Sequence, residues 1–180
     1  MSAYCIVGLG NPGTEYDDTP HNTGKFMAEL FSKKYEEKKA KIILPSVFMN
    51  QSGKAVKGIP AKWLILLHDD IDLPLGKFKI VFNRGSGGHK GVESVIRAIG
   101  SQKFLRIRIG ICPPKKPARN ATHSVAGGKP NHRELMKFLT HKFKPSESAA
   151  IKKISKKILE ALETIITEGP EKAMTLYNNN

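Results

Sequence analysis

Short apolar runs alternate with segments of helical periodicity along this chain of 180 residues. Five runs are expected to be strands, because each is apolar over about four to eight residues or alternates with a period of two. Three segments repeat apolar side chains every three or four residues, as amphipathic helices do. The expected strands cover residues 4–9, 41–44, 63–68, 78–82 and 104–111, and the expected helices cover 22–34, 89–99 and about 146–168. This alternation predicts an α/β fold, with a mixed, mostly parallel twisted sheet and helices on both faces.

The length and composition predict one domain spanning residues 1–180, since cores of about 100 to 200 residues are the usual unit. Hydrophobic residues make up 39% of the chain and charged residues 26%, which suits a folded domain. Residues 113–130 are rich in Pro, Gly, Lys and Asn without periodicity, and predict an exposed, mobile loop. No apolar run approaches the ~20 residues that span a bilayer, and no signal peptide is recognisable. We therefore expect a cytoplasmic protein without a membrane partner.

The chain carries a large excess of positive charge. Thirty Lys and Arg residues against 16 Asp and Glu residues give a formal net charge of +14. A field of this sign attracts polyanions and speeds their encounter with the protein. Nucleic acid is therefore the expected partner, and a lysine-rich surface that only aids solubility is the alternative.

A glycine-rich turn follows the first expected strand. Residues 8–13 read Gly-Leu-Gly-Asn-Pro-Gly, which matches the GxGxxG pattern of dinucleotide-binding proteins. In those proteins the turn opens a helix that receives the pyrophosphate, whereas residues 14–20 here are polar and end in Pro20. We therefore expect no dinucleotide cofactor. The turn instead presents Asn11 at the carboxyl end of a strand, where open α/β sheets bind their ligands.

His21 and Asp69 are the first candidates for chemistry. His21 lies directly before an expected helix that Asn22 or Thr23 could cap, and its imidazole could take a proton from water near neutral pH. Asp69 falls at the end of a buried strand, where an aspartate is costly unless it is paired, and His21 is the expected partner. The alternatives are a surface or capping role for His21, and turn residues or a Mg²⁺ site for Asp69, Asp70 and Asp72.

Two loop asparagines could assist this pair. Asn11 and Asn50 can donate to a carbonyl oxygen or accept from water, so either could stabilise an oxyanion. The chain has no recognisable Ser or Cys nucleophile elbow, which favours direct attack by water. Cys5 and Cys112 lie inside apolar runs and are expected to be buried, without a disulfide or metal spacing.

Five blocks of residues follow one another in a recognisable order. They are residues 6–13 with Tyr16, Thr19, His21, Asn22 and Gly24; 48–53 (Phe-Met-Asn-Gln-Ser-Gly); 68–74 (His-Asp-Asp-Ile-Asp-Leu-Pro); 85–89 (Gly-Ser-Gly-Gly-His); and 106–110 (Arg-Ile-Arg-Ile-Gly). In these blocks the chain resembles the bacterial peptidyl-tRNA hydrolases over nearly its whole length.

The resemblance implies a monomeric esterase without a metal or cofactor, which releases tRNA from peptidyl-tRNA or N-blocked aminoacyl-tRNA. By position, His21 corresponds to the general base and Asp69 to its partner, while Asn11 and Asn50 hold the peptide and the water. The resemblance also implies that Tyr16 contributes to the substrate site and that Arg108 grips the 5′-phosphate of the tRNA. The lysine that accompanies this arginine in the family aligns with Val81, and Lys79 is expected to replace it.

The chain departs from the family pattern at three places. Pro20 stands where the family usually has Arg, and residues 39–42 lie in a segment shortened by about one strand pair. Lys90, a candidate substrate-binding residue, stands where the family usually has an Asn that helps place substrate or water. Because an ammonium group can donate but not accept, Lys90 is the main support for the alternative of a non-catalytic RNA-binding relative. The presence of His21, Asp69, Asn11 and Asn50 together favours the enzyme.

Overall fold

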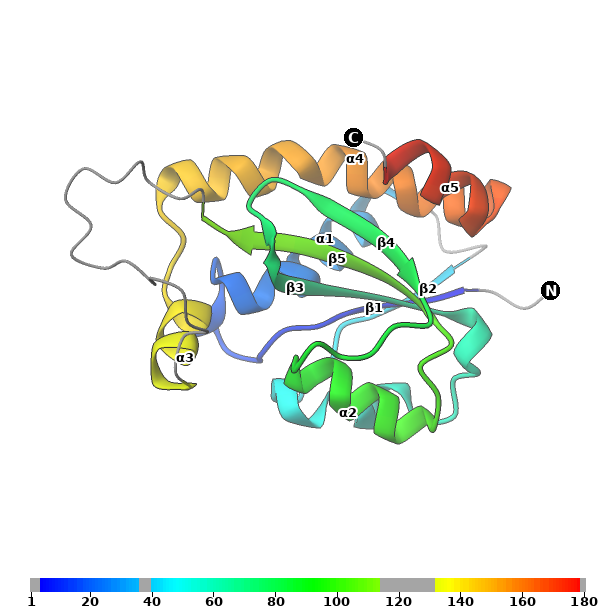
Figure 1. Ribbon diagram of the computed structural model, residues 1–180, viewed down its shortest axis with the longest axis horizontal. Helices are drawn as coiled ribbons and strands as arrows, with labels where there is room; N and C mark the ends of the chain where they lie inside the picture. The colour runs from blue at the N-terminus through cyan, green and yellow to red at the C-terminus, as the bar shows by residue number, and fades with distance from the viewer. Residues whose placement is uncertain (1–3, 36–39, 114–131, 179–180) are drawn as a thin grey trace.

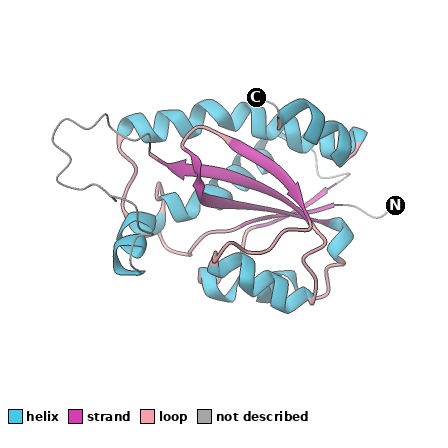
Figure 2. Cartoon of the chain, in the orientation of Figure 1, coloured by secondary structure: helices cyan, strands magenta, loops and turns pink. Residues whose placement is uncertain are grey.

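One five-stranded sheet runs through the middle of the molecule (Figures 1 and 2). The computed structural model describes residues 4–35, 40–113 and 132–178. The strands are β1 (Tyr4–Gly8), β2 (Ala40–Ile43), β3 (Leu64–Pro74), β4 (Phe78–Phe82) and β5 (Leu105–Cys112), in the order β2-β1-β3-β5-β4. All neighbouring pairs are parallel except β4 and β5, which are antiparallel. The predicted mixed, mostly parallel sheet is confirmed.

Helices cover both faces of this sheet, as the alternating pattern predicted (Figure 1). One face packs against α1 (Thr23–Lys34), the long α4 (Pro145–Glu168) and α5 (Pro170–Tyr177), with inward side chains such as Ile65 and Ile107. The other face packs against α2 (Lys90–Ile99) and the 3-10 helix η3 (Met49–Val56). Three short 3-10 helices, η1 (Thr14–Tyr16), η2 (Pro20–Asn22) and η4 (Ala61–Trp63), connect these elements.

Some expected elements need correction. The strand predicted at 63–68 continues as β3 to Pro74, because β5 supplies hydrogen-bond partners beyond Asp69 across an irregularity between Asp70 and Pro74. The acidic stretch is therefore strand rather than turn, and Asp69 lies within β3 rather than at its end. The helix α3 (His132–Thr140), which was not predicted, lies beside η2 at one end of the sheet.

Burial also differs from expectation at particular side chains. Arg106 and Arg108 lie two residues apart on β5 and so share a strand face, yet Arg106 is buried, at 2% exposure. Cys5 and Cys112 are half-buried rather than buried. The mobile loop predicted at 113–130 lies outside the described residues except for Pro113. Among the helices that the structure describes, none combines the length and apolar character required to cross a membrane.

Candidate active site

The polar side chains gather where β1 and β3 approach the start of α1. Two glycines allow this approach: a Cβ atom at Gly24 would lie 2.2 Å from the carbonyl oxygen of Leu67, and one at Gly8 would lie 2.5 Å from the carbonyl oxygen of Gly24. Such distances exclude any side chain at either position. The close packing brings η2, and with it His21, against the polar segment of β3.

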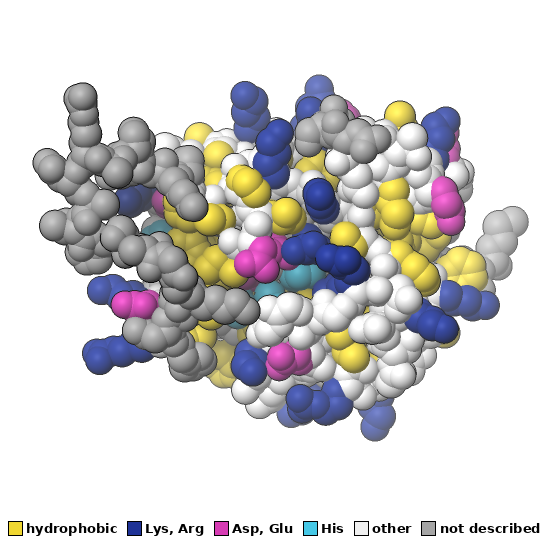
Figure 3. All heavy atoms as spheres, viewed as in Figure 1, with side chains coloured by type: hydrophobic (Ala, Val, Ile, Leu, Met, Phe, Trp, Pro, Cys, Tyr) yellow, Lys and Arg dark blue, Asp and Glu magenta, His cyan; other side chains and the backbone are white. Residues whose placement is uncertain are grey.

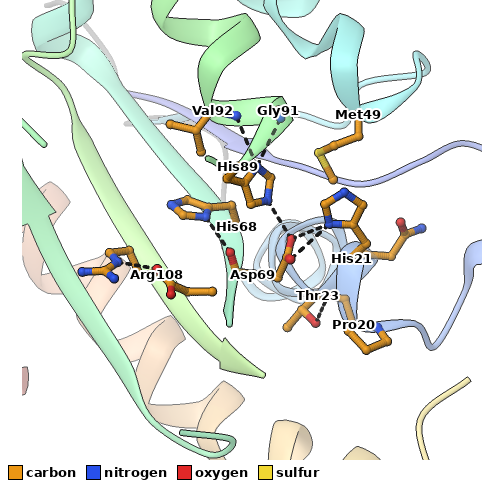
Figure 4. Close-up of polar contacts among 12 residues, drawn as sticks. Pro20, His21, Thr23, Met49, His68, Asp69, His89, Gly91, Val92 and Arg108 are labelled. Carbon is orange, nitrogen blue, oxygen red and sulfur yellow. Dashed lines mark hydrogen bonds and ion pairs between the residues drawn. The ribbon is translucent and has the colours of Figure 1, made fainter. Parts of the chain in front are cut away.

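His21 and Asp69 form the predicted pair (Figure 4). The Nδ1 atom of His21 lies 3.0 Å and 3.1 Å from the two carboxylate oxygens of Asp69. Both residues are buried, at 5% and 2% exposure. A carboxylate can only accept, so the Nδ1–H of His21 donates and the lone pair is on Nε2. This is the tautomer that a general base requires.

His89 also binds Asp69, and sequence reasoning missed it. Its Nε2–H donates to Asp69 Oδ1 over 2.9 Å. Its Nδ1 accepts from the backbone N–H groups of Gly91 and Val92, at 3.2 and 3.3 Å, which caps α2. The two amide donors require a lone pair on Nδ1, so the proton of a neutral His89 is on Nε2. A histidine between a glycine loop and an expected helix was the available signal, because helix N-termini need a side-chain acceptor.

A third histidine, His68, completes the group around Asp69 (Figure 4). Its Nδ1–H donates to the backbone carbonyl of Asp69 over 2.7 Å, and its ring centroid lies 4.8 Å from that of His89. Among the described residues, its buried Nε2 has no hydrogen-bond partner. Burial, followed by repulsion from His89, holds the pKa of His68 well below its usual range, so the ring is neutral.

The two members of the central pair shift each other's pKa. Burial by itself would raise the pKa of Asp69, but His21 and His89 outweigh it and hold the pKa well below its ordinary value. Burial would likewise lower the pKa of His21, but the charge and hydrogen bond of Asp69 outweigh it and raise the pKa above 6.5. Asp69 is therefore ionised, and His21 becomes a free base only above its raised pKa.

Asn11 lies on the glycine turn after β1 and is oriented by three bonds. Its Oδ1 accepts from the backbone N–H of Met49 over 2.8 Å, which leaves Nδ2 as the donor. The side chain of Asn22 bonds both the backbone N–H and the carbonyl of Asn11, at 2.7 and 3.0 Å. Asn22 therefore fixes the turn and makes no capping bond to α1, which corrects the capping role expected for it.

Asn50 and Tyr16 lie near the segment that contacts Asn11. Asn50 is exposed and follows Met49 in η3, while Tyr16 meets the exposed ring of Phe48 edge to face at 6.3 Å. Figure 4 shows His21 between Met49 and Asp69. The hydrogen bond from Met49 to Asn11 thus joins the first two sequence blocks.

On the other side of His21 is a pocket of about 330 Å³ between β3, α3 and the loop before α2. Arg108, Asp70 and Lys90 line it, and Leu135, Met136 and Leu139 of α3 form an apolar wall. Arg108 donates through Nε to Asp70 over 2.5 Å. Lys79, which is exposed, is the strand partner of Arg108, whereas Val81 is the partner of Arg106. Paired antiparallel residues share a sheet face, so Lys79 and Arg108 lie on the same side.

Arg106 and Lys90, two basic residues that line this pocket, differ in their surroundings. Arg106 donates through Nη2 to the carbonyls of Arg84 and Gly85, at 2.7 and 3.0 Å, and so holds the glycine loop that leads to His89. Burial lowers the pKa of Arg106 to about 10, which leaves it charged at neutral pH. Lys90 is mostly exposed and pairs with Glu93 over 3.3 Å.

The arrangement is poorly suited to a metal ion. His21, Asp69 and His89 offer three possible ligand atoms within 4.8 Å of one another. However, Nε2 of His89 carries the ring proton, because Nδ1 already accepts two amide N–H groups. The Mg²⁺ alternative fits no better, because Asp69 is engaged by histidines and Asp70 by Arg108. The residues present form a hydrogen-bonded network.

Known proteins resemble this chain over nearly its whole length. Residues 5–180 match the peptidyl-tRNA hydrolase family. The peptidyl-tRNA hydrolase of Thermodesulfovibrio yellowstonii is 36% identical over 198 aligned positions, which cover 96% of this chain and 97% of the relative. That of Aquifex aeolicus is 32% identical, with 99% and 97% covered. The solved structure of the Acinetobacter baumannii peptidyl-tRNA hydrolase shares the fold, with a TM-score of 0.81 at 24% identity, covering 98% and 94% of the two chains.

Proposed function

This chain belongs to the peptidyl-tRNA hydrolase family, and we propose that it hydrolyses the ester between a peptide, or an N-blocked amino acid, and tRNA with His21 as general base. The observation that carries this assignment is the buried pair of His21 and Asp69, in which the lone pair of the imidazole is on Nε2. This side chain can deprotonate water, and its carboxylate partner stabilises the imidazolium that results.

The reaction proceeds by direct attack of water on the ester carbonyl. His21 Nε2 takes one proton from the water, and the new C–O bond gives a tetrahedral oxyanion. Asn11 donates from Nδ2 to the substrate, an orientation supported by the bond between its Oδ1 and the Met49 N–H. When the C–O bond to the ribose breaks, the imidazolium returns its proton to the leaving tRNA oxygen. His89 keeps Asp69 in position through the second bond to its carboxylate.

Substrate binding is assigned to the residues on either side of this pair. Asn50 and Tyr16 contact the peptide side, and Lys90 lies at the mouth of the pocket on the other side. Arg108 and Lys79, which share a sheet face, bind the 5′-phosphate of the tRNA. The enzyme acts as a monomer in the cytoplasm and needs no metal. No specific observation favours the non-catalytic alternative, because Lys90 is exposed and the catalytic pair is intact.

The test is single-turnover release of N-acetyl-amino acid from N-acetyl-aminoacyl-tRNA by the wild type and by His21→Ala. We expect the rate to fall by roughly 10²- to 10⁴-fold, the usual contribution of a general base. Binding of uncharged tRNA is measured in parallel and should be unchanged. Equal release by both proteins would exclude His21 as the base. Binding without release by the wild type would support the non-catalytic alternative.

A further inference from the structure

A side chain from the end of the chain bonds the free edge of β4. β4 is the edge strand of the sheet, and in the described part of the chain only β5 pairs with it. Asn178, which follows α5, lies at the open edge. Its Oδ1 accepts from the N–H of Ile80 over 2.8 Å, and its Nδ2–H donates to the carbonyl of Ile80 over 2.9 Å. An antiparallel neighbour strand would make the same two bonds, so the amide takes the place of a further strand at this residue.

The end of α5 sets the position of Asn178. The backbone N–H of Asn178 donates to the carbonyl of Met174 over 3.1 Å, which closes the last turn of α5. The ring of Tyr177 lies 6.3 Å from that of Phe78, and α5 packs alongside β4 (Figure 1). Because the helix already holds Asn178 beside the strand, its two bonds to Ile80 cost little conformational entropy.

These bonds do more than satisfy two polar groups, because water can satisfy the outward groups of an edge strand. They fix the middle residue of β4 from the side that β5 leaves open. The side chain of Ile80 is buried in the core, at 1% exposure. At Ile80, β4 is therefore held by β5, by the core and by Asn178.

The residue next to this contact belongs to the proposed phosphate site. Lys79 precedes Ile80 and is the strand partner of Arg108. The N–H and carbonyl of Ile80 point away from β5, so those of Lys79 point toward it, because the direction alternates along an antiparallel strand. In Figure 3 Lys and Arg side chains lie beside the histidines, on the face that β4 crosses in Figure 1. Fixing β4 from both sides thus fixes the backbone of Lys79 relative to that of Arg108.

We propose that Asn178 is a positioning residue for the phosphate site: it holds β4 from its free edge and so orders Lys79 beside Arg108 before the substrate binds. The proposal rests on the proposed function, which assigns these two cations to the 5′-phosphate of the tRNA. When β4 is already ordered, phosphate binding restricts only the lysine side chain, whereas a loose edge strand would have to be ordered as well.

The test compares N-acetyl-aminoacyl-tRNA that carries a 5′-phosphate with the same substrate that carries a 5′-hydroxyl. Wild type, Asn178→Ala and Asn178→Asp are assayed with both substrates. Ile6→Val, in the buried core of β1, is the control for a general loss of stability. Hydrogen exchange of the Ile80 amide is measured in each protein, because Asn178 bonds that N–H directly.

Asn178→Ala should raise KM for the 5′-phosphate substrate by roughly three- to tenfold, with kcat unchanged, and should leave KM for the 5′-hydroxyl substrate as in the wild type. Protection of the Ile80 amide should fall in the same variant. Asn178→Asp should lie between the alanine variant and the wild type, because a carboxylate still accepts from the Ile80 N–H but cannot donate to the carbonyl. Ile6→Val should keep the wild-type ratio of the two KM values.

Several outcomes would overturn the proposal. A wild-type ratio of the two KM values in Asn178→Ala would show that the amide has no effect on phosphate binding. An equal rise of KM with both substrates, or the same loss of discrimination in Ile6→Val, would show only a general loss of stability. Equal KM values of the wild type for the two substrates would contradict the phosphate site, and with it the role of Asn178. Failure of the wild type to release any amino acid would instead contradict the proposed function.

Discussion

The catalytic pocket and a hollow between α4 and the turn before β4 use polar residues in opposite ways. Lys77, Lys153 and Lys157 line this hollow, which we call the basic groove. In the pocket, Asp69 is buried and held by two histidines at 2.9 to 3.1 Å. In the groove, Lys153 and Lys157 are exposed and no ion pair with a described residue fixes them. A buried charge requires partners, which also fix its geometry, whereas an exposed charge acts over distance and is screened by salt. Changes in the pocket should therefore act on kcat, and changes in the groove on KM and salt dependence.

Asp69→Asn should have the largest effect and would test the pocket half of this comparison. An amide cannot replace the charge of the carboxylate, and the loss of an orienting aspartate in a His-Asp pair can cost about 10⁴-fold. We expect kcat/KM to fall by roughly 10³- to 10⁴-fold, with tRNA binding retained.

The same variant should also move the pH profile. Wild-type kcat/KM should fall as the pH drops through the raised pKa of His21, because the protonated ring cannot accept a proton. Without the negative charge of Asp69, burial dominates the surroundings of His21, so its pKa should fall and the acid limb should move to lower pH. A limb that stays in place would show that another group titrates there.

His89 should have the next largest effect, and two substitutions separate its roles. His89→Asn keeps a good N-cap for α2 but should not reach Asp69, whereas His89→Ala loses both functions. Both should lower kcat by roughly 10- to 100-fold with little change in KM. Only the alanine should also lose about 1 kcal/mol of unfolding free energy from the missing cap.

A pH profile distinguishes a positioning role of His89 from a merely structural one. Removal of its bond leaves the Asp69 charge more available to His21, so the pKa of His21 should rise further. The acid limb of kcat/KM should therefore move to higher pH in His89→Asn, opposite to the shift in Asp69→Asn. If the acid limb of kcat/KM is unchanged in both His89 variants, the only role of His89 is to cap α2.

Most of the fold could be predicted because local patterns determine it. The period of α4 predicted a helix at 146–168, and it spans Pro145–Glu168; β4 has the predicted bounds. The end of β3 was wrong, because the hydrogen bonds that extend it to Pro74 come from β5, about forty residues later in the chain. No local pattern carries that information.

The site was predicted less completely for the same reason. The pairing of His21 with Asp69 followed from the cost of burying a carboxylate. The contacts of His68 and His89 depend on how α2 and β3 meet, which sequence periodicity does not contain. Arg106 is buried and donates to the carbonyls of Arg84 and Gly85, a contact with a distant loop that the alternation of β5 does not contain.

Arg108 lines the catalytic pocket but is proposed to bind a phosphate, so its variants should have effects of intermediate size. Arg108→Ala should weaken tRNA binding by roughly tenfold and reduce the salt slope by about one, as removal of one phosphate-binding cation does. Asp70→Asn should tighten binding a few-fold, because Asp70 no longer competes for the guanidinium. Weaker binding in Asp70→Asn would mean that the carboxylate orients Arg108 for the phosphate. An unchanged salt slope in Arg108→Ala would contradict the contact itself.

Lys90→Asn should have the smallest effect, and it tests whether exposure separates binding residues from catalytic ones. Lys90 lines the catalytic pocket, yet it is exposed and forms with Glu93 a surface ion pair, which contributes at most about 1 kcal/mol. We expect kcat to be preserved or to rise by a few-fold, because an amide can both donate and accept where the ammonium only donates. Steady-state kinetics at two salt concentrations check this. A large fall in kcat would show that Lys90 positions the reacting groups, so that exposure alone would not separate binding residues from catalytic ones.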